Sequence, residues 1–245
     1  MHRVGIMQGR LSPPVGGSIQ SFPRATWQKE FSLARDCAFS HIEWVFDTYS
    51  CKDNPILTDQ GLETIASLQR STGVKILSVC GDYFRDFPIF RIDSTSFKKR
   101  INIFSKLARS CEKLGVEYIM IPFVDNFAIK SKGEFEEVIV ALQSCLLAIE
   151  KYDVQISLET NLEPHSYKEL LIKVDHPRLK VNYDIGDCTS LGHPIEKEIR
   201  LLAKWIVGFH IKDRKAGGHT VPLGMGDVDL TLAFKPCLLL AIEAP

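Results

Sequence analysis

Residues 154–213 carry the pattern that decides the fold, because three short apolar runs recur there: VQISLE at 154–159, LKVNYD at 179–184 and IVGFHIKD at 206–213. Each run is nearly continuous in hydrophobicity, whereas a strand with one exposed face would alternate. Strands buried on both faces have this composition, and they are typical of a parallel sheet covered by helices. The three runs therefore predict parallel β-strands.

Five further runs of the same kind complete the pattern, at residues 3–7, 41–46, 74–79, 117–123 and 238–243. Stretches of helical period separate them, with apolar residues recurring every three or four positions across 97–114, 135–149 and 195–202. Gly73 and Gly115 stand just before strands, where helix C-caps are expected. Repeated strand–helix alternation predicts right-handed βαβ units. Eight runs, with no GxGxxG after the first, favour one α/β domain over residues 1–245, a (β/α)8 TIM barrel.

The end of the sequence is compressed. Seventeen steps separate Gly226 from Glu243, and Pro236 interrupts them, so a full crossover helix plus a strand fits poorly there. We therefore expect a shortened or incomplete eighth β/α unit. A missing outer helix would expose an apolar groove beside strands one, seven and eight, which favours self-association into a homo-oligomer.

The overall composition excludes several classes of protein. Thirty basic and 30 acidic residues give zero net charge, which argues against nucleic-acid or anionic-membrane partners. No apolar run approaches the ~20 residues of a membrane helix, and MHRVGIMQGR contains no signal-peptide core. The seven cysteines form no CxxC pair and are expected to be reduced thiols. These features predict a cytoplasmic protein.

Four runs carry residues that suit a metal site: Glu159, Asp184 and Glu243 stand at the ends of their runs, and His210 stands within the run 206–213. The active site of a TIM barrel lies at the C-terminal ends of its strands, so these side chains are expected to converge at one mouth. Taken singly, each is more often a helix N-cap, a salt-bridge partner or a core histidine. Together, three carboxylates and one imidazole predict a divalent-cation site, because a cation would relieve the repulsion between the carboxylates.

The motifs resemble those of the xylose-isomerase-like barrel superfamily of sugar and sugar-phosphate isomerases and epimerases. The resemblance covers essentially the whole chain, through GIMQGRLSP, IEW, LETN, YDIGD, FHIKD, GMGDVD and IEAP. It implies that Glu159, Asp184, His210 and Glu243 bind one Mn²⁺, Mg²⁺ or Co²⁺ ion, with Zn²⁺ as a further candidate. It also implies that Glu159 and Glu243 act as the acid/base pair. Some ketose epimerase relatives have a histidine where this chain has Asp187, so the substrate contact made there would differ.

The residue types by themselves also suit proton transfer beside a carbonyl group. A 2-hydroxy carbonyl sugar can chelate a metal, which polarises the carbonyl and stabilises an enediolate. One carboxylate removes the α-proton, and for epimerisation a second carboxylate on the opposite face returns it. Isomerisation can instead return the proton to the neighbouring carbon or use a hydride shift, and the sequence leaves these routes open.

Further side chains are candidates for binding the substrate, a small sugar or sugar phosphate. They are Gln8, Arg10, Glu43, Asp187, Lys212 and Arg214. Of the two cations, Arg214 is the stronger candidate, because its planar fork suits oxyanions. The competing interpretations are ordinary loop polarity, an internal ion pair of Glu43, and surface pairing of Lys212 and Arg214 with Asp213. Asn161 and Asn182 are expected to support neighbouring carboxylates, whereas His193 and His219 are expected in exposed loops.

Two other functions compete with a sugar isomerase or epimerase. Abasic-site endonucleases of the same superfamily are metal-dependent hydrolases, but they need a histidine-rich three-zinc cluster. Only His210 stands at a convincing strand end here, and the neutral charge argues against tracking a phosphate backbone. A catalytically degenerate sugar-binding barrel is supported only by the compressed C-terminal segment.

Overall fold

The computed structural model describes residues 3–15, 20–48, 51 and 53–231. The chain divides into two compact units. The first comprises residues 1–122 and 140–156, and the second comprises residues 123–139 and 157–245. The single domain expected over 1–245 stays a prediction beside this division.

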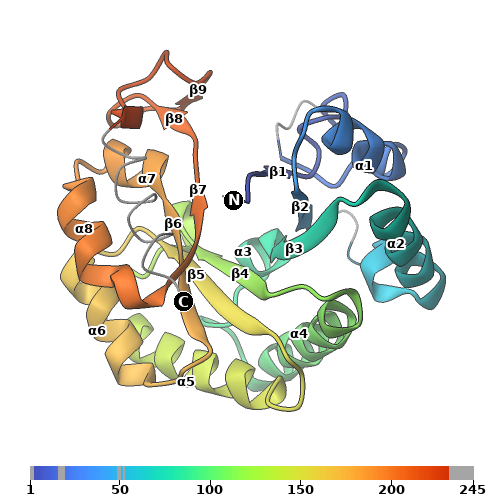
Figure 1. The fold of residues 1–245 in the computed structure, drawn as a ribbon. Helices are drawn as coiled ribbons and strands as arrows, with labels where there is room; N and C mark the ends of the chain where they lie inside the picture. The colour runs from blue at the N-terminus through green and yellow to red at the C-terminus, as the bar shows by residue number, and fades with distance from the viewer. Residues whose placement is uncertain (1–2, 16–19, 49–50, 52, 232–245) are drawn as a thin grey trace. The chain divides into compact units, whose positions relative to one another are not determined.

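Seven of the eight predicted strands are present, and they follow one another in chain order in the sheet (Figure 1). They are β1 (Gly5–Met7), β2 (His41–Val45), β3 (Lys75–Cys80), β4 (Tyr118–Phe123), β5 (Gln155–Thr160), β6 (Leu179–Asp184) and β7 (Ile206–His210). The pairs β1–β2, β2–β3, β3–β4 and β6–β7 are parallel. This strand order with intervening helices confirms the predicted α/β fold of TIM-barrel type. The eighth run, 238–243, lies outside the described residues.

The seventh strand is shorter than predicted. The run 206–213 was expected to be one strand, but β7 ends at His210. The chain then leaves the sheet, and β8 (Asp213–Arg214) pairs antiparallel with β9 (Thr220–Val221). His210 is thereby the last residue of its strand.

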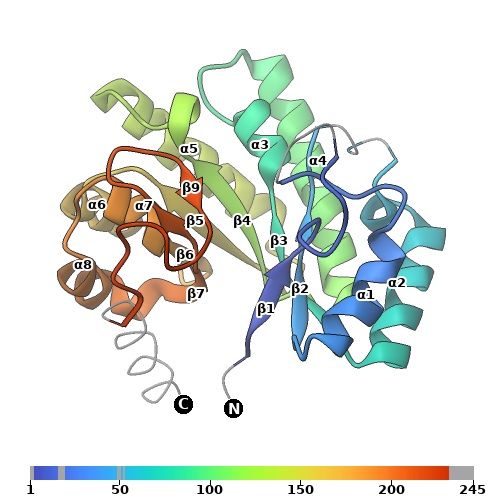
Figure 2. The same cartoon turned by 90° about the horizontal axis from the view of Figure 1, so that it is seen from above.

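The helices of the first unit pack along its strands. They are α1 (Trp27–Asp36), α2 (Asp59–Thr72), α3 (Asp82–Asp86) and α4 (Ser94–Leu114), with a 3-10 turn η1 (Pro55–Leu57) before α2. Helices α1 and α2 lie side by side in both views (Figures 1 and 2). Gly73 and Gly115 cap α2 and α4 with left-handed backbones, φ 78° and 73°, as the sequence predicts.

Aromatic side chains fill much of the core of this first unit. Trp44 on β2 is fully buried, and its ring contacts Phe22 and Trp27 at centroid distances of 5.3 and 5.4 Å. Phe46 contacts Tyr83 at 5.4 Å, which fastens the segment after β2 to α3. Such tilted and edge-on contacts are favourable for aromatic rings and hold the strand ends in place.

The second unit carries the later strands and their helices. They are α6 (Pro164–Val174), α7 (Ile185–Ser190) and α8 (Ile195–Leu202), with 3-10 turns η2 (Asp125–Phe127) and η3 (Ala203–Trp205). Helix α5 (Lys132–Ala148) contributes residues to both units. The predicted apolar stripe of α8 is buried at Ile195, Ile199 and Leu202. Among the described residues, no helix has the length and apolar character needed to cross a membrane.

Candidate active site

Three of the four predicted metal ligands converge in the second unit. Glu159 lies near the end of β5, while Asp184 and His210 are the last residues of β6 and β7. Asp184 and His210 face each other in the parallel register of β6 and β7. The C-terminal ends of parallel strands lie at one edge of the sheet, so both side chains are found there. Each of the three residues offers a ligand atom within 4.8 Å of the others. Glu243 lies outside the described residues.

The contacts within this cluster centre on one imidazole nitrogen. His210 Nδ1 lies 2.9 Å from Glu159 Oε2 and 3.7 Å from Asp184 Oδ2. Asn182 Nδ2, on β6, donates to Glu159 Oε2 at 3.3 Å, as predicted for a supporting amide. Asp184 Oδ1 accepts from the Asp187 backbone N–H at 2.8 Å and so caps the start of α7.

Burial and charge act differently on the two carboxylates. Glu159 and Asp184 are 8% and 4% exposed. Burial raises the pKa of Glu159, and the hydrogen bond with His210 opposes this shift only in part. Burial also acts on Asp184, but His210 and the Lys212 ammonium hold the pKa of Asp184 below its ordinary value. The site thus holds one carboxylate that takes up a proton more readily than the other.

Two cations and a third carboxylate extend the cluster. Lys212 Nζ lies 2.9 Å from Asp184 Oδ2 and 2.8 Å from Asp187 Oδ1. Arg214 donates Nη1 to Asp187 Oδ1, and its Nε and Nη2 donate to the Gly218 carbonyl at 3.2 and 2.8 Å. The alternative interpretation, in which Lys212 and Arg214 pair with Asp213 at the surface, is therefore wrong. Both cations pair with Asp187 instead.

Glycine makes this arrangement sterically feasible. A Cβ on Gly186, in the YDIGD motif, would come within 2.5 Å of Lys212 Cγ. Only glycine at this position lets the Lys212 side chain pass over α7 to the carboxylates. Asp213 has a separate role, because its carboxylate accepts backbone N–H groups of Gly224, Gly226 and Val228 at 2.8–3.2 Å. It thereby folds the GMGDVD loop back onto the end of the IKDR segment.

The residues present fit a divalent cation. Two carboxylates and an imidazole suit Mn²⁺, Co²⁺ or Zn²⁺. With Asp187 included, the cluster has three carboxylates and only two cationic side chains, Lys212 and Arg214. It therefore keeps a net negative charge that would attract a metal ion. The Lys212 ammonium contacts the same Asp184 oxygen that an ion would use, which makes Lys212 a competitor for that position.

Three predicted substrate-binding residues belong to the first unit, and their role stays a prediction. Gln8 is 1% exposed, and its Oε1 accepts the Val45 backbone N–H at 3.0 Å. This hydrogen bond holds the end of β2 in place, which is a structural role. Glu43 is a buried residue of β2, and Arg10 lies in the exposed loop after β1.

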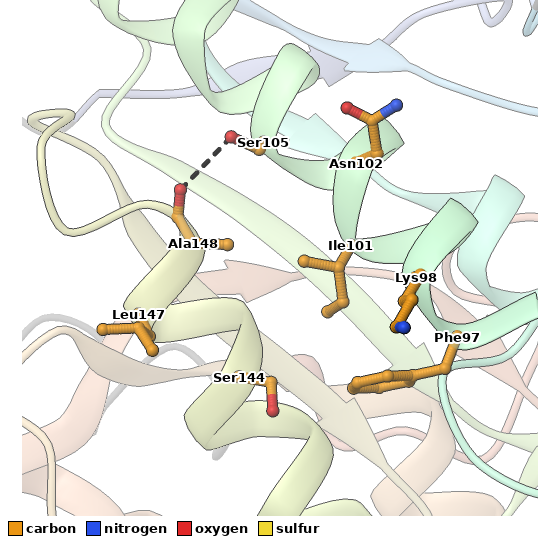
Figure 3. A pocket seen from close by; sticks show the side chains of 8 residues that line it. All are labelled: Phe97, Lys98, Ile101, Asn102, Ser105, Ser144, Leu147 and Ala148. Atoms are coloured by element: carbon orange, nitrogen blue, oxygen red, sulfur yellow. Dashed lines mark hydrogen bonds between the residues drawn. The ribbon is translucent and has the colours of Figure 1, made fainter. Parts of the chain in front are cut away.

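The first unit also contains a pocket of about 430 Å³ (Figure 3). Its labelled side chains come from α4 and from the second half of α5, and they include Phe97, Ile101 and Leu147. Ser105 Oγ donates to the Ala148 carbonyl at 3.2 Å along one side. Its lining is mainly apolar and carries none of the predicted site residues.

Sequence reasoning missed a second group of potential ligands, formed by Cys188, His193 and Glu198. The expectation that His193 is exposed is wrong, since its side chain is only 9% exposed, whereas His219 is exposed as predicted. The sequence does contain an indication of this group, because Glu198 places a carboxylate on the apolar face of α8. A buried carboxylate needs a polar partner.

Comparison with known proteins identifies relatives along almost the full chain. Residues 31–236 match the xylose isomerase-like TIM barrel family. The putative L-ribulose-5-phosphate 3-epimerase SgbU of Haemophilus influenzae is 25% identical, over 96% of this chain and 83% of that protein.

Solved structures show the same fold. D-psicose 3-epimerase from Clostridium cellulolyticum H10, solved with D-tagatose, superimposes with a TM-score of 0.76 at 16% identity, over 99% of this chain and 83% of that one. The IOLI protein with a bound zinc atom gives a TM-score of 0.73 at 19% identity, over 99% and 85% of the two chains. The family match covers most of the sequence, and the resemblance inferred from the motifs is confirmed. The chain belongs to the xylose isomerase-like TIM barrel family.

Proposed function

We propose that this protein is a metal-dependent isomerase or epimerase of a sugar or sugar phosphate, which moves a proton beside a carbonyl group. The observation that carries the proposal is the Glu159–Asp184–His210 cluster at the ends of three successive strands. The relatives named L-ribulose-5-phosphate 3-epimerase support a phosphorylated ketose as the substrate. The similarity to D-psicose 3-epimerase keeps free ketoses as candidates.

Glu159, Asp184 and His210 would hold the divalent ion, and we propose Glu243 as its fourth ligand. Once bound, the ion would act as a Lewis acid on a 2-hydroxy carbonyl sugar. His210 Nδ1 and the carboxylate oxygens within 4.8 Å of it are the candidate ligand atoms. Mn²⁺, Mg²⁺ and Co²⁺ are the proposed ions, and the zinc-bound relative supports Zn²⁺ as an alternative.

Glu159 is the proposed base. Its contacts with His210 and Asn182 both use Oε2, so Oε1 is the oxygen that we propose to exchange the substrate proton. Burial raises the pKa of Glu159, so this carboxylate takes up a substrate proton more readily than an ordinary carboxylate does. For epimerisation, Glu243 is the proposed partner that acts from the opposite face.

Lys212 is the better placed of the two cations to contact a sugar oxygen or phosphate. Its side chain is 30% exposed, and two of its three ammonium hydrogens suffice for Asp184 and Asp187. Arg214 is 23% exposed, and it already uses Nε and both terminal nitrogens on Gly218 and Asp187. We therefore assign Arg214 chiefly to positioning Asp187, whose carboxylate accepts from both cations.

The test follows solvent hydrogen at the carbon beside the carbonyl. The full chain is loaded with Mn²⁺ in D₂O and given a panel of ketoses and ketose 5-phosphates, and the products are read by NMR. Deuterium is expected at that carbon in the product. Glu159→Gln keeps the shape of the side chain but cannot accept a proton, so turnover should fall by about 10²–10⁴-fold. The exposed Glu169 provides a matched control, and Glu169→Gln should leave turnover unchanged.

Three other results would contradict parts of this proposal. Product without solvent deuterium would favour a hydride shift and overturn Glu159 as a proton-transfer base. No turnover and no bound ion would support the degenerate sugar-binding barrel. Full activity in Glu243→Gln would remove Glu243 from the chemistry.

A further inference from the structure

A second set of metal-ligating side chains lies in the second unit, outside the cluster assigned to catalysis. Cys188 is on α7, His193 is in the following loop and Glu198 is on α8, and each offers a ligand atom within 4.8 Å of the others. The side chains of His193 and Glu198 are only 9% and 3% exposed. A thiol, an imidazole and a carboxylate thus meet in a largely buried place.

Local structure accounts for this meeting. The His193 backbone N–H donates to the Cys188 carbonyl at 2.9 Å, which turns the loop back over the end of α7. Helix α8 then begins at Ile195, and its buried face carries Glu198 inward between apolar neighbours. The three side chains therefore come from one continuous segment, folded as helix, tight loop and helix.

Two further contacts surround the three side chains. His193 Nδ1 lies 3.6 Å from Glu198 Oε2, while its other nitrogen, Nε2, lies 3.5 Å from the exposed Glu163 carboxylate. The Tyr183 hydroxyl donates to Glu198 Oε2 at 3.1 Å. Glu163 thus lies at the second nitrogen of His193, and Tyr183 contacts both Glu198 and Cys188.

We propose that Cys188 Sγ, His193 Nδ1 and Glu198 bind a Zn²⁺ ion, separate from the catalytic ion. Sulfur, nitrogen and oxygen ligands together suit zinc, and a water molecule would complete a tetrahedral set of four. Ligand atoms of such a site lie about 3.3–3.8 Å apart, which matches the 3.6 Å between His193 and Glu198.

The outer contacts support the same assignment. Metal-binding histidines commonly donate their second nitrogen to a carboxylate, and Glu163 stands in that position. A bound ion would join Cys188 on α7 to Glu198 on α8 and so fasten the two helices to each other.

The position gives the zinc site a role in ordering the active site. Asp187 directly precedes Cys188 on α7, and it accepts from Lys212 and Arg214. Fixing Cys188 to α8 would fix Asp187 as well, and with it the two cations. The ion would therefore act as a structural clamp and would not contact substrate.

Co²⁺ provides the probe, because cobalt bound to a thiolate has a near-ultraviolet charge-transfer band and cobalt bound only to oxygen and nitrogen lacks it. The full wild-type chain titrated with Co²⁺ should show the band, and Zn²⁺ should abolish it by displacement. Cys188→Ser should lose the band, whereas the same change at the exposed Cys37 should retain it. Asp184→Asn should also retain it, because the catalytic cluster contains no thiol.

Glu163→Gln tests the site in a variant that should fold normally, because the Glu163 side chain is 78% exposed. Loss of this outer partner should weaken Zn²⁺ binding by about 10–100-fold while the protein stays folded. No band in the wild-type chain, or an undiminished band in Cys188→Ser, would overturn the zinc site. Unchanged Zn²⁺ affinity in Glu163→Gln would overturn the assignment of His193 Nδ1 as the inner nitrogen.

Discussion

Lys212 contributes a positive charge at the atom where the proposed catalytic ion would bind. Its Nζ lies 2.9 Å from Asp184 Oδ2, and Gly186 provides the space through which the side chain passes. Asp184, Asp187 and Glu159 raise the pKa of Lys212 against the effect of burial, so the amine stays charged at neutral pH. Metal and ammonium therefore compete for the same carboxylate.

Replacing this lysine should affect metal and substrate binding in opposite directions. In Lys212→Met, the missing positive charge should tighten Mn²⁺ binding by about tenfold or more, while loss of a donor should raise KM for the sugar. Isothermal titration with Mn²⁺ measures the first effect and steady-state kinetics the second. Lys215→Met is the control, because Lys215 is exposed and pairs with Asp227. Mn²⁺ binding that weakens in Lys212→Met would show that the lysine supports the ion.

The sequence anticipated more about individual elements than about the contacts between side chains. Nearly continuous apolar runs located β2 to β6 within one or two residues, because buried parallel strands leave little choice of residue. The run 206–213 misled, since Ile211 continues the apolar pattern beyond the end of β7 at His210. Apolar residues that continue past the last residue of a strand hide its end from a hydropathy pattern.

The same contrast holds for the candidate site. Strand ends predicted the meeting of Glu159, Asp184 and His210, because register fixes which residues share an edge. The salt bridge from Lys212 to Asp187 depends on the path of the lysine side chain across α7, which no periodicity in the sequence encodes. The burial of His193 likewise depends on a loop turning back on itself, so the sequence alone suggested an exposed residue.

At the scale of elements, the helix ends offer a paired test of backbone conformation. Gly115 ends α4 at φ 73° with no atom near the position of a Cβ, so Gly115→Ala introduces backbone strain without a clash. It should lower the free energy of unfolding by about 1 kcal/mol. Gly133 is the second residue of α5 and has ample room for a Cβ, so Gly133→Ala should raise the free energy of unfolding by about 0.4–1 kcal/mol. Urea denaturation measures both, and equal signs for the two variants would contradict this account.

At the scale of the whole molecule, a bound ion should couple to stability. An ion that binds only the folded chain stabilises it by about 2.7 kcal/mol at a hundred times its dissociation constant. For a chain of 245 residues this corresponds to a rise in Tm of roughly 5–11 °C. Mn²⁺ prefers oxygen and nitrogen ligands, so this rise should report the Glu159–Asp184–His210 cluster and not the thiol-containing zinc site.

Two variants separate these ions in the same thermal measurement. Asp184→Asn removes a charged ligand, so it should lose most of the rise in Tm with Mn²⁺ and keep any rise with Zn²⁺ that arises at Cys188. Cys188→Ser should keep the Mn²⁺ rise and lose the Zn²⁺ contribution of that site. Asp36→Asn, at an exposed carboxylate, should behave like the wild-type chain with both ions. An unchanged Mn²⁺ rise in Asp184→Asn would place the ion elsewhere, because a buried carboxylate ligand cannot lose its charge without weakening the cation that it offsets.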